Sequence, residues 1–208
     1  MRRVVPVMAI AAAAIFSIAV YSRLPDVMPI HWGVSGEPDG FAPKPWAVLL
    51  LPFIALVVYG ILVAVRRHAW RHAGDAAFVR ASETTIALVV SFLSFVHIVV
   101  LGSALGWSVD VPRFIVLGIG VMLILLGFQM VEMPRNPWFG IRTPWTLRSD
   151  RVWQRTHHVG SRVMVLCGVA MGFSTLLTAA WMVSVVLLTA LVMVVSTIGY
   201  SYWIARSD

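Results

Sequence analysis

Charged residues are scarce in this chain of 208 residues: only 12% of its side chains are charged, whereas 60% are hydrophobic. Soluble globular chains have about 25% charged residues and about 45–50% apolar ones. A soluble fold of this length has no interior large enough to bury such an apolar excess. The composition therefore excludes an ordinary soluble domain, and it excludes intrinsic disorder for the same reason. We predict an integral membrane protein.

Cysteine is almost absent as well. The one cysteine, Cys167, lies inside an apolar run. A single thiol excludes a disulfide framework and a thiolate metal cage. The spacings typical of a Ser/His/Asp hydrolase or of a His-Glu-x-x-His zinc enzyme are also missing from the sequence. We therefore expect no enzymatic activity, no cofactor and no bound metal.

Uncharged stretches long enough to cross a bilayer follow one another along the chain. A helix needs about 20 apolar residues to span a hydrocarbon core of about 30 Å. The stretches that cross once are Val4–Ser22, Pro45–Val65, Thr84–Val109 and Phe114–Val131. A longer stretch, Val163–Ala205, predicts two helices with a turn near Thr178–Trp181, because Trp favours the membrane interface. The expected fold is an all-α integral membrane protein with six transmembrane helices.

Basic residues predict the orientation, because Lys and Arg are retained on the cytoplasmic side of the membrane. With the N-terminus inside, only Arg23, Lys44 and Arg113 of the 16 basic residues lie outside. The cytoplasmic ones are Arg2, Arg3, Arg66, Arg67, Arg71, Arg80, Arg135, Arg142, Arg148, Arg151, Arg155, Arg162 and Arg206. Both termini are therefore expected in the cytoplasm. Anionic lipids favour the same pattern, so the net charge of +7 does not require a nucleic acid partner.

The N-terminal run also has the basic start and the apolar core of a secretory signal. It is longer than the usual core of such a signal, and Tyr21, Ser22 and Arg23 form a poor small-residue cleavage site. We therefore expect this run to remain in the protein as its first transmembrane helix.

Two polar side chains, His97 and Gln129, lie within a predicted span. An ionisable residue at membrane depth indicates a functional role by default, which would make His97 part of a proton or ligand path. The alternative is a neutral imidazole hydrogen-bonded to a hydroxyl group, such as that of Ser91, Ser94 or Ser103.

Glycines inside the predicted spans indicate close packing between helices. They are Gly118, Gly120, Gly127, Gly168 and Gly172. Gly168 and Gly172 have the small-xxx-small spacing of helices whose backbones approach each other within a membrane.

The predicted outer loop, residues 22–45, is rich in proline and glycine. Proline forbids a continuous helix and glycine permits tight turns, so a compact structured loop is expected. His31, Glu37 and Asp39 could instead bind a metal ion, although their spacing matches no standard ligand signature. The candidate functional residues of this loop are His31, Trp32, Pro38, Asp39 and Lys44.

The segment between the fourth and fifth predicted spans, residues 136–160, combines turn-forming residues with a basic stretch. Its prolines and Gly140 direct a defined backbone path. A short interfacial helix is expected next, with arginines on one face and Trp153 at the depth of the lipid headgroups. One interpretation is a membrane anchor with an aromatic belt. The other is a loop that holds Arg142 and Thr146 in place for a partner or a lipid.

Two motifs resemble known bacterial families. The outer loop, with LP at residues 24–25, P-x-HWG at 29–33 and G-x-PDG at 36–40, resembles a membrane domain of unknown function. The sequence GIRTPWTL at residues 140–147 closely resembles the signature of the SdpI/YfhL family of membrane immunity proteins. The residues that match this signature are Asn136, Gly140, Ile141, Arg142, Thr143, Pro144, Trp145, Thr146, Leu147, Val152, Trp153, Thr156, His157 and Gly160. Gln129 departs from the Asn expected there.

The resemblance implies two membrane domains. One is a two-helix domain over residues 1–65 with the outer loop at 22–45, and the other is an SdpI-like four-helix domain over 84–205 with the inner motif at 136–160. It also implies a non-enzymatic, multi-pass protein of the bacterial plasma membrane, which confers resistance to a membrane-active toxic peptide and docks a cytoplasmic repressor. The residues expected to bind a partner or ligand are Asn136, Gly140, Arg142, Thr143, Trp145, Thr146, Trp153, Thr156 and His157.

Two other functions are compatible with these residues. One is a small membrane enzyme or transporter for a lipid or small solute, with His31 and Asp39 outside, or Arg142 and His157 inside, as its polar centre. The other is an oligomer or a subunit of a larger membrane complex, which small-residue helix faces would favour. Direct binding of nucleic acid is not expected, because the arginines lie at a membrane surface that is rich in lipid phosphate.

Overall fold

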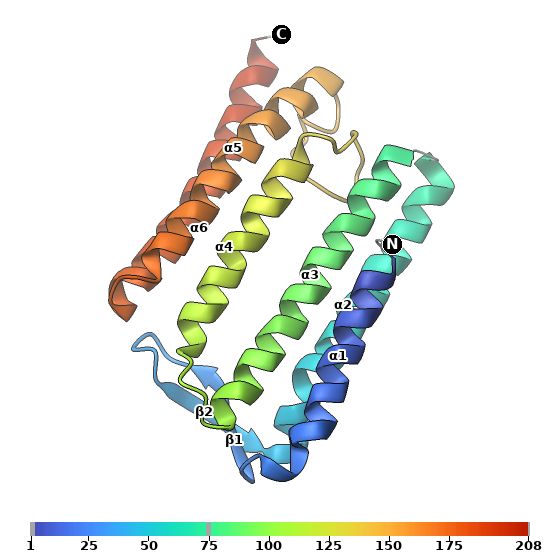
Figure 1. Cartoon of the computed structure of the whole chain (residues 1–208). Helices are drawn as coiled ribbons and strands as arrows, with labels where there is room; N and C mark the ends of the chain where they lie inside the picture. The colour runs from blue at the N-terminus through green and yellow to red at the C-terminus, as the bar shows by residue number, and fades with distance from the viewer. Residues whose placement is uncertain (1–2, 74–75, 208) are drawn as a thin grey trace.

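The computed structural model describes residues 3–73 and 76–207, which form long helices and one small β-hairpin (Figure 1). The α-helices of this part are α1 (Val4–Val20), α2 (Lys44–Ala73), α3 (Ala76–Ala104), α4 (Val111–Met130), α5 (Asp150–Ser174) and α6 (Ala179–Arg206). A short 3-10 turn, Tyr21–Arg23, leads from α1 to strands β1 (Val27–Trp32) and β2 (Pro38–Pro43). Arg2, one of the arginines predicted to be cytoplasmic, lies outside the described residues.

Five helices of the described residues are long and apolar enough to cross a membrane, so the chain is a multi-pass membrane protein. These candidate spans are Val4–Arg23, Lys44–Arg71, Ala76–Ala104, Val111–Met130 and Ala179–Arg206. The prediction of six helices is confirmed, but the prediction of six apolar spans is not. The exception is α5, because Asp150, Arg151, Arg155 and Arg162 lie in its first half.

The prediction of a separate interfacial helix is also wrong. Its residues form the first half of α5, which continues without a break into the apolar second half and ends at Ser174. The turn to α6 is at residues 175–178, about three residues before the position predicted from Trp181. The hydroxyl groups of Ser174 and Thr175 donate hydrogen bonds to the carbonyl oxygens of Met171 and Gly172, both at 2.7 Å. These side-chain bonds add to the backbone bond from the Thr175 N–H to the Gly172 carbonyl oxygen at the end of α5.

The hairpin and the loop between α4 and α5 lie at opposite ends of the helix bundle (Figure 1). The last turns of α2, the first turns of α3 and the last turns of α6 lie at the same end as the α4–α5 loop. α5 runs beside α4 and α6 along the bundle, and these two pairs are in extensive contact. The positions of these helix ends and loops agree with helices that alternate in direction. The cytoplasmic placement of the termini stays a prediction.

The outer loop is structured, as the sequence predicts, but it contains an antiparallel hairpin that the all-α prediction missed. Val27 pairs with Pro43 at one end of the hairpin, and Trp32 pairs with Pro38 at the other. The Gly33 N–H donates to the Glu37 carbonyl oxygen at 2.9 Å and closes the turn. The proline and glycine content indicates turns before it indicates strands, which is why the sequence did not reveal the hairpin.

Buried side chains attach the hairpin to the ends of the first three helices. Met28 of β1 is fully buried and packs in one cluster with Val20, Val48 and Leu101. These residues come from α1, α2 and α3. α3 also contacts α4, so it joins the N-terminal helices to the C-terminal ones. The boundary between the two predicted domains, before residue 84, stays a prediction.

Glycine allows the backbones of α4 and α5 to touch. A Cβ atom on Gly120 would lie 2.7 Å from the Gly168 carbonyl oxygen, and one on Gly168 would lie 2.5 Å from the Gly120 carbonyl oxygen. A Cβ atom on Gly172 would meet no atom within 4 Å. Gly168 and Gly172 have small-xxx-small spacing, but a side chain would have no room at Gly168 and would have room at Gly172.

We expect Gly168→Ala to destabilise the protein by about 1–3 kcal/mol, because the added methyl group must push two backbones apart. Gly172→Ala is the matched control on the same helix and should leave stability almost unchanged, since its Cβ atom has open space. Thermal unfolding of the two purified variants in detergent measures the difference. Equal unfolding temperatures for both variants would contradict this account of the α4–α5 contact.

Candidate functional site

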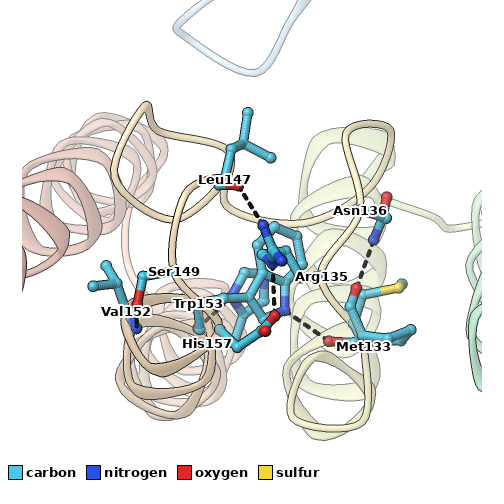
Figure 2. A network of polar contacts seen from close by, with 10 residues as sticks. Met133, Arg135, Asn136, Leu147, Ser149, Val152, Trp153 and His157 are labelled. Carbon is cyan, nitrogen blue, oxygen red and sulfur yellow. Dashed lines mark hydrogen bonds and ion pairs between the residues drawn. The ribbon is translucent and has the colours of Figure 1, made fainter.

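Residues 136–149 of the inner motif form a loop that crosses the adjacent ends of α4 and α5, and residues 150–160 form the first turns of α5 (Figure 2). Asn136 shapes the start of this loop. Its side-chain oxygen accepts hydrogen bonds from the N–H groups of Trp138 at 2.9 Å and Phe139 at 2.7 Å, and its Nδ2 donates to the Pro134 carbonyl oxygen at 2.8 Å. Because the side chain is buried and its amide is used by the turn, Asn136 has a structural role here.

His157 joins α5 to the middle of the loop. Its Nε2 accepts a hydrogen bond from the Ile141 N–H at 3.1 Å, and its Nδ1 bonds to the Trp153 carbonyl oxygen at 2.8 Å. Nδ1 must therefore carry the proton, while Nε2 must keep its lone pair. Gly140 precedes Ile141 with φ +102°, where glycine is favoured, and any Cβ atom there would collide with the His157 ring.

The neutral form of His157 is required by this geometry and by its burial. The residue is 1% exposed. Burial lowers the pKa of His157 to about 4, because the charged imidazolium loses its hydration. A proton on Nε2 would also remove the acceptor for the Ile141 N–H. At neutral pH His157 therefore acts as a fixed hydrogen-bonding bridge between loop and helix.

Thr143 and Thr146 close the second half of the loop by bonding to each other. The Thr143 N–H donates to Thr146 Oγ1 at 2.9 Å, and the Thr146 N–H donates to Thr143 Oγ1 at 3.2 Å. Thr146 Oγ1 also donates to the Ile141 carbonyl oxygen at 2.8 Å. Both threonines are buried. The hypothesis that the loop holds Thr146 for a partner therefore does not fit, because the loop itself uses this hydroxyl group.

Trp153 anchors α5 against the end of α4. Its Nε1–H donates to the Met133 carbonyl oxygen at 2.8 Å, and its ring stacks on that of His157 with centroids 3.9 Å apart (Figure 2). The ring is 1% exposed and packs in one cluster with Ala69 and Phe78 of α2 and α3. The expectation that Trp153 lies among lipid headgroups is wrong, because it belongs to a core that connects four parts of the chain.

The start of α5 is held in place by Arg135, Ser149 and Asp150. Arg135 and Ser149 were not among the candidate residues predicted from the sequence. The Arg135 guanidinium bonds to the Asp150 carboxylate at 2.6 Å and to the Leu147 carbonyl oxygen at 2.7 Å (Figure 2). Ser149 Oγ accepts a hydrogen bond from the Val152 N–H at 3.3 Å, as an N-cap residue does. The Ser-Asp pair before the apolar face was the available signal for this helix start.

Basic side chains cover the outside of this folded loop. We use the term basic face for the exposed residues Arg142, Arg148, Arg151 and Arg155. Arg142 makes one hydrogen bond within the loop, to the Pro137 carbonyl oxygen at 3.0 Å. Beside this face Trp145 is half-buried against the ring of Tyr202 on α6, with centroids 5.1 Å apart. Arg142 is thus a charged and exposed residue among the predicted site residues of the inner motif.

Thr156 and Gly160 lie on the buried face of α5. Thr156 is fully buried, and its hydroxyl group has no hydrogen-bond partner in the described structure. A Cβ atom on Gly160 would collide with the Ile141 side chain. Glycine at this position lets the loop lie directly on the helix.

The outer-loop candidates stabilise the hairpin. His31 Nδ1 bonds to the Asp39 carboxylate at 2.5 Å across the two strands, and Pro38 pairs with Trp32. The Lys44 ammonium group lies 3.4 Å from the Asp26 carboxylate. In the part of the chain that the structure describes, no group of three His, Cys, Asp or Glu side chains could hold a metal ion.

The two intramembrane polar residues each bond to a neighbouring helix. His97 Nε2 lies 2.7 Å from the Ser17 hydroxyl oxygen of α1, so His97 has the expected hydroxyl partner, but on a neighbouring helix and not at the serines of α3 named as examples. Gln129 of α4 donates to the Thr85 hydroxyl oxygen at 2.9 Å and to the Ala81 carbonyl oxygen of α3. These bonds connect helices that are distant in sequence. The candidate polar residues of the outer loop, of the inner motif and of the spans therefore do not form one site. They lie at the two ends of the bundle and within it.

The comparisons with known proteins agree with both motifs. Residues 132–201 match the SdpI/YfhL protein family, and residues 8–56 match a domain of unknown function, DUF1648. The chain is also 26% identical over 204 residues to the immunity protein SdpI of Bacillus subtilis (strain 168), which covers 97% of this chain and 96% of that protein. The chain thus carries an SdpI/YfhL segment behind a segment of the domain of unknown function, and it is a distant relative of that immunity protein. No solved structure matches it.

The family match confirms the resemblance seen in the sequence. It contains the whole inner motif, α5 and most of α6. The match to the domain of unknown function contains most of α1, the hairpin and the first part of α2. The folded loop described above therefore lies within the SdpI/YfhL part of the chain.

We expect the stability of this protein to fall as the pH decreases from 6.5 to 4. The pKa of His157 is about 4 in the folded protein and 6.5 as a free side chain, so the unfolded chain binds the proton first. The contribution of His157 is fully present above pH 6.5, and about 3 kcal/mol of it is lost at pH 4. Unfolding midpoints at several pH values should show a smaller pH dependence for His157→Gln. His158→Gln, with an exposed ring, should keep most of the wild-type dependence, because burial lowers the pKa of His157 more than the neighbouring His158 charge does. The same slope in both variants would refute this role of His157.

We expect Trp153→Phe to cost about 1–3 kcal/mol of stability, because the buried Met133 carbonyl oxygen loses its hydrogen-bond donor and the smaller ring leaves a gap in the core. Trp203→Phe on α6 is the matched control, since that tryptophan is 61% exposed. Thermal unfolding in detergent compares the two. A control variant that loses as much stability as Trp153→Phe would show that the hydrogen bond is not the cause.

Proposed function

We propose that this protein is a non-enzymatic immunity protein of the bacterial plasma membrane, which confers resistance to a membrane-active toxic peptide. The relationship to an immunity protein over nearly the full length of both chains supports this role. The five candidate spans and the family membership are compatible with action inside or at the surface of the bilayer.

The folding of the inner motif is the observation that carries the proposal. Asn136, Thr143, Thr146 and His157 use their polar atoms in bonds within the motif. Catalysis needs polar groups that face a substrate, whereas these groups face their own loop. A rigid loop with charged residues on its outside suits recognition of a partner. This favours a binding protein over an enzyme or transporter.

The basic face suits a partner with an acidic surface. Arg142, Arg148 and Arg155 are exposed near the bundle end that also carries the C-terminus. If the predicted orientation holds, this end faces the cytoplasm. We therefore extend the proposal to a cytoplasmic regulator that docks on the basic face, held there by charge-assisted hydrogen bonds from arginine. The toxic peptide would be met within the bilayer or at the hairpin.

We expect expression of the protein to restore survival of a sensitive bacterial strain that is challenged with membrane-active peptides. The Thr146→Val variant should protect less, because the loop loses the bonds that shape it, whereas Arg23→Gln at the opposite end should protect as well as wild type. Survival counts at equal membrane levels of each protein provide the measurement. Equal killing with and without the wild-type protein would overturn the proposal.

A further inference from the structure

The ends of α2 and α3 extend past the start of α1, so that α1 does not cover them (Figure 1). This uncovered end carries Arg66, Arg67 and Arg71 on α2 and Arg80 on α3. Together with Arg3 and Glu83 these arginines line a cavity of about 590 Å³, and Trp70 lies at the same cavity. We call this cavity the arginine pocket. It is separate from the basic face, because it lies on other helices.

One buried carboxylate organises the arginine pocket. Glu83 of α3 lies 3.2 Å from the Arg66 guanidinium of α2 and 2.5 Å from that of Arg3 beside α1. The side chains of Glu83 and Arg66 are only 11% and 15% exposed. A basic residue that serves only to orient the protein in the membrane needs no such position, since its charge alone is sufficient. The ion pairs fix the three helices around the cavity.

The other arginines of the pocket keep their charge available. Arg67, Arg71 and Arg80 are exposed, and within residues 3–73 and 76–207 their side chains make no hydrogen bond or ion pair. Five arginines against one glutamate leave the pocket with a surplus of positive charge. Positive charge would still exceed negative charge if Asp75, which lies outside the described residues, were counted as a second anion. The pocket therefore suits an anionic ligand.

A second, smaller cavity adjoins the arginine pocket. It has a volume of about 200 Å³ and shares Arg3, Arg66, Arg67 and Glu83 with the arginine pocket. Its other lining residues are Pro6, Tyr59, Val63 and Ile86. Val63 and Tyr59 lie about one and two turns before Arg66 on α2, so this cavity runs toward the middle of the bundle. A ligand with a charged head and an apolar chain would fill both cavities.

We propose that the arginine pocket binds the phosphate headgroup of an anionic membrane lipid, with the start of one acyl chain in the adjoining cavity. Arginine presents two parallel N–H groups to phosphate oxygens and is favoured wherever phosphate is recognised. Basic pockets between transmembrane helices are typical sites for such headgroups. Trp70 is 47% exposed at the pocket, and tryptophan is enriched at headgroup depth. The site does not depend on the proposed immunity role.

The test uses the full-length protein in neutral detergent and native mass spectrometry of the lipid that it retains. Wild type should retain phosphatidylglycerol in preference to phosphatidylcholine. In Arg67→Gln/Arg80→Gln the apparent affinity for phosphatidylglycerol should fall about a hundredfold, tenfold for each arginine–phosphate hydrogen bond that the variant cannot make. Both side chains are exposed, so the variant should keep its helical content. Arg80→Gln alone, with an expected decrease of about tenfold, replaces the double variant should that variant fail to fold.

Arg148→Gln/Arg155→Gln is the matched control, because it removes the same charge from the basic face. This control should retain phosphatidylglycerol as wild type does. Equal retention by wild type and Arg67→Gln/Arg80→Gln would overturn the site, and so would an equal decrease in the control. Inorganic phosphate that stabilises the protein against heat as strongly as phosphatidylglycerol would point to a soluble anion and overturn the assignment to a lipid.

Discussion

Every backbone N–H and C=O group at membrane depth needs a hydrogen-bond partner within the protein, because the hydrocarbon offers none. This constraint explains why long helices make up almost all of the described structure. The two loops lie at the ends of the bundle, outside this constraint, yet each still supplies many of its own hydrogen-bond partners. The outer loop pairs its two strands, and the inner loop uses the side chains of Asn136, Thr143, Thr146 and His157.

The inner motif shows how a signature of a family can be mainly structural. Most of its residues lie inside the loop or against α5, where Trp153 and His157 connect the ends of α4 and α5. A substitution at these positions would break contacts inside the motif and so change the shape of its surface. Arg142 is different, because it belongs to the signature and is exposed. Specificity for a partner is therefore expected to lie in the exposed residues around a common buried frame.

The same bundle presents charge in two different ways. The basic face lies on a loop and on the first turns of α5, and it is open to a large partner. The arginine pocket lies between α2 and α3, and it continues into a cavity lined partly by apolar side chains. An exposed surface suits a protein, whereas an enclosed basic pocket with an apolar extension suits a lipid. The shape around the arginines, rather than their number, separates these two sites.

The sequence by itself determined the membrane environment, six helices and the family, because uncharged runs and the GIRTPWTL motif are local features of the chain. It did not reveal that α5 begins at Asp150, since the arginines of its first half interrupt the apolar run. Only the tertiary structure decided that His97 bonds to Ser17 and that Gln129 bonds to Thr85, because these partners are 80 and 44 residues apart. Spacing along a chain predicts which residues share a helix, but the packing of helices decides which polar atoms meet across them.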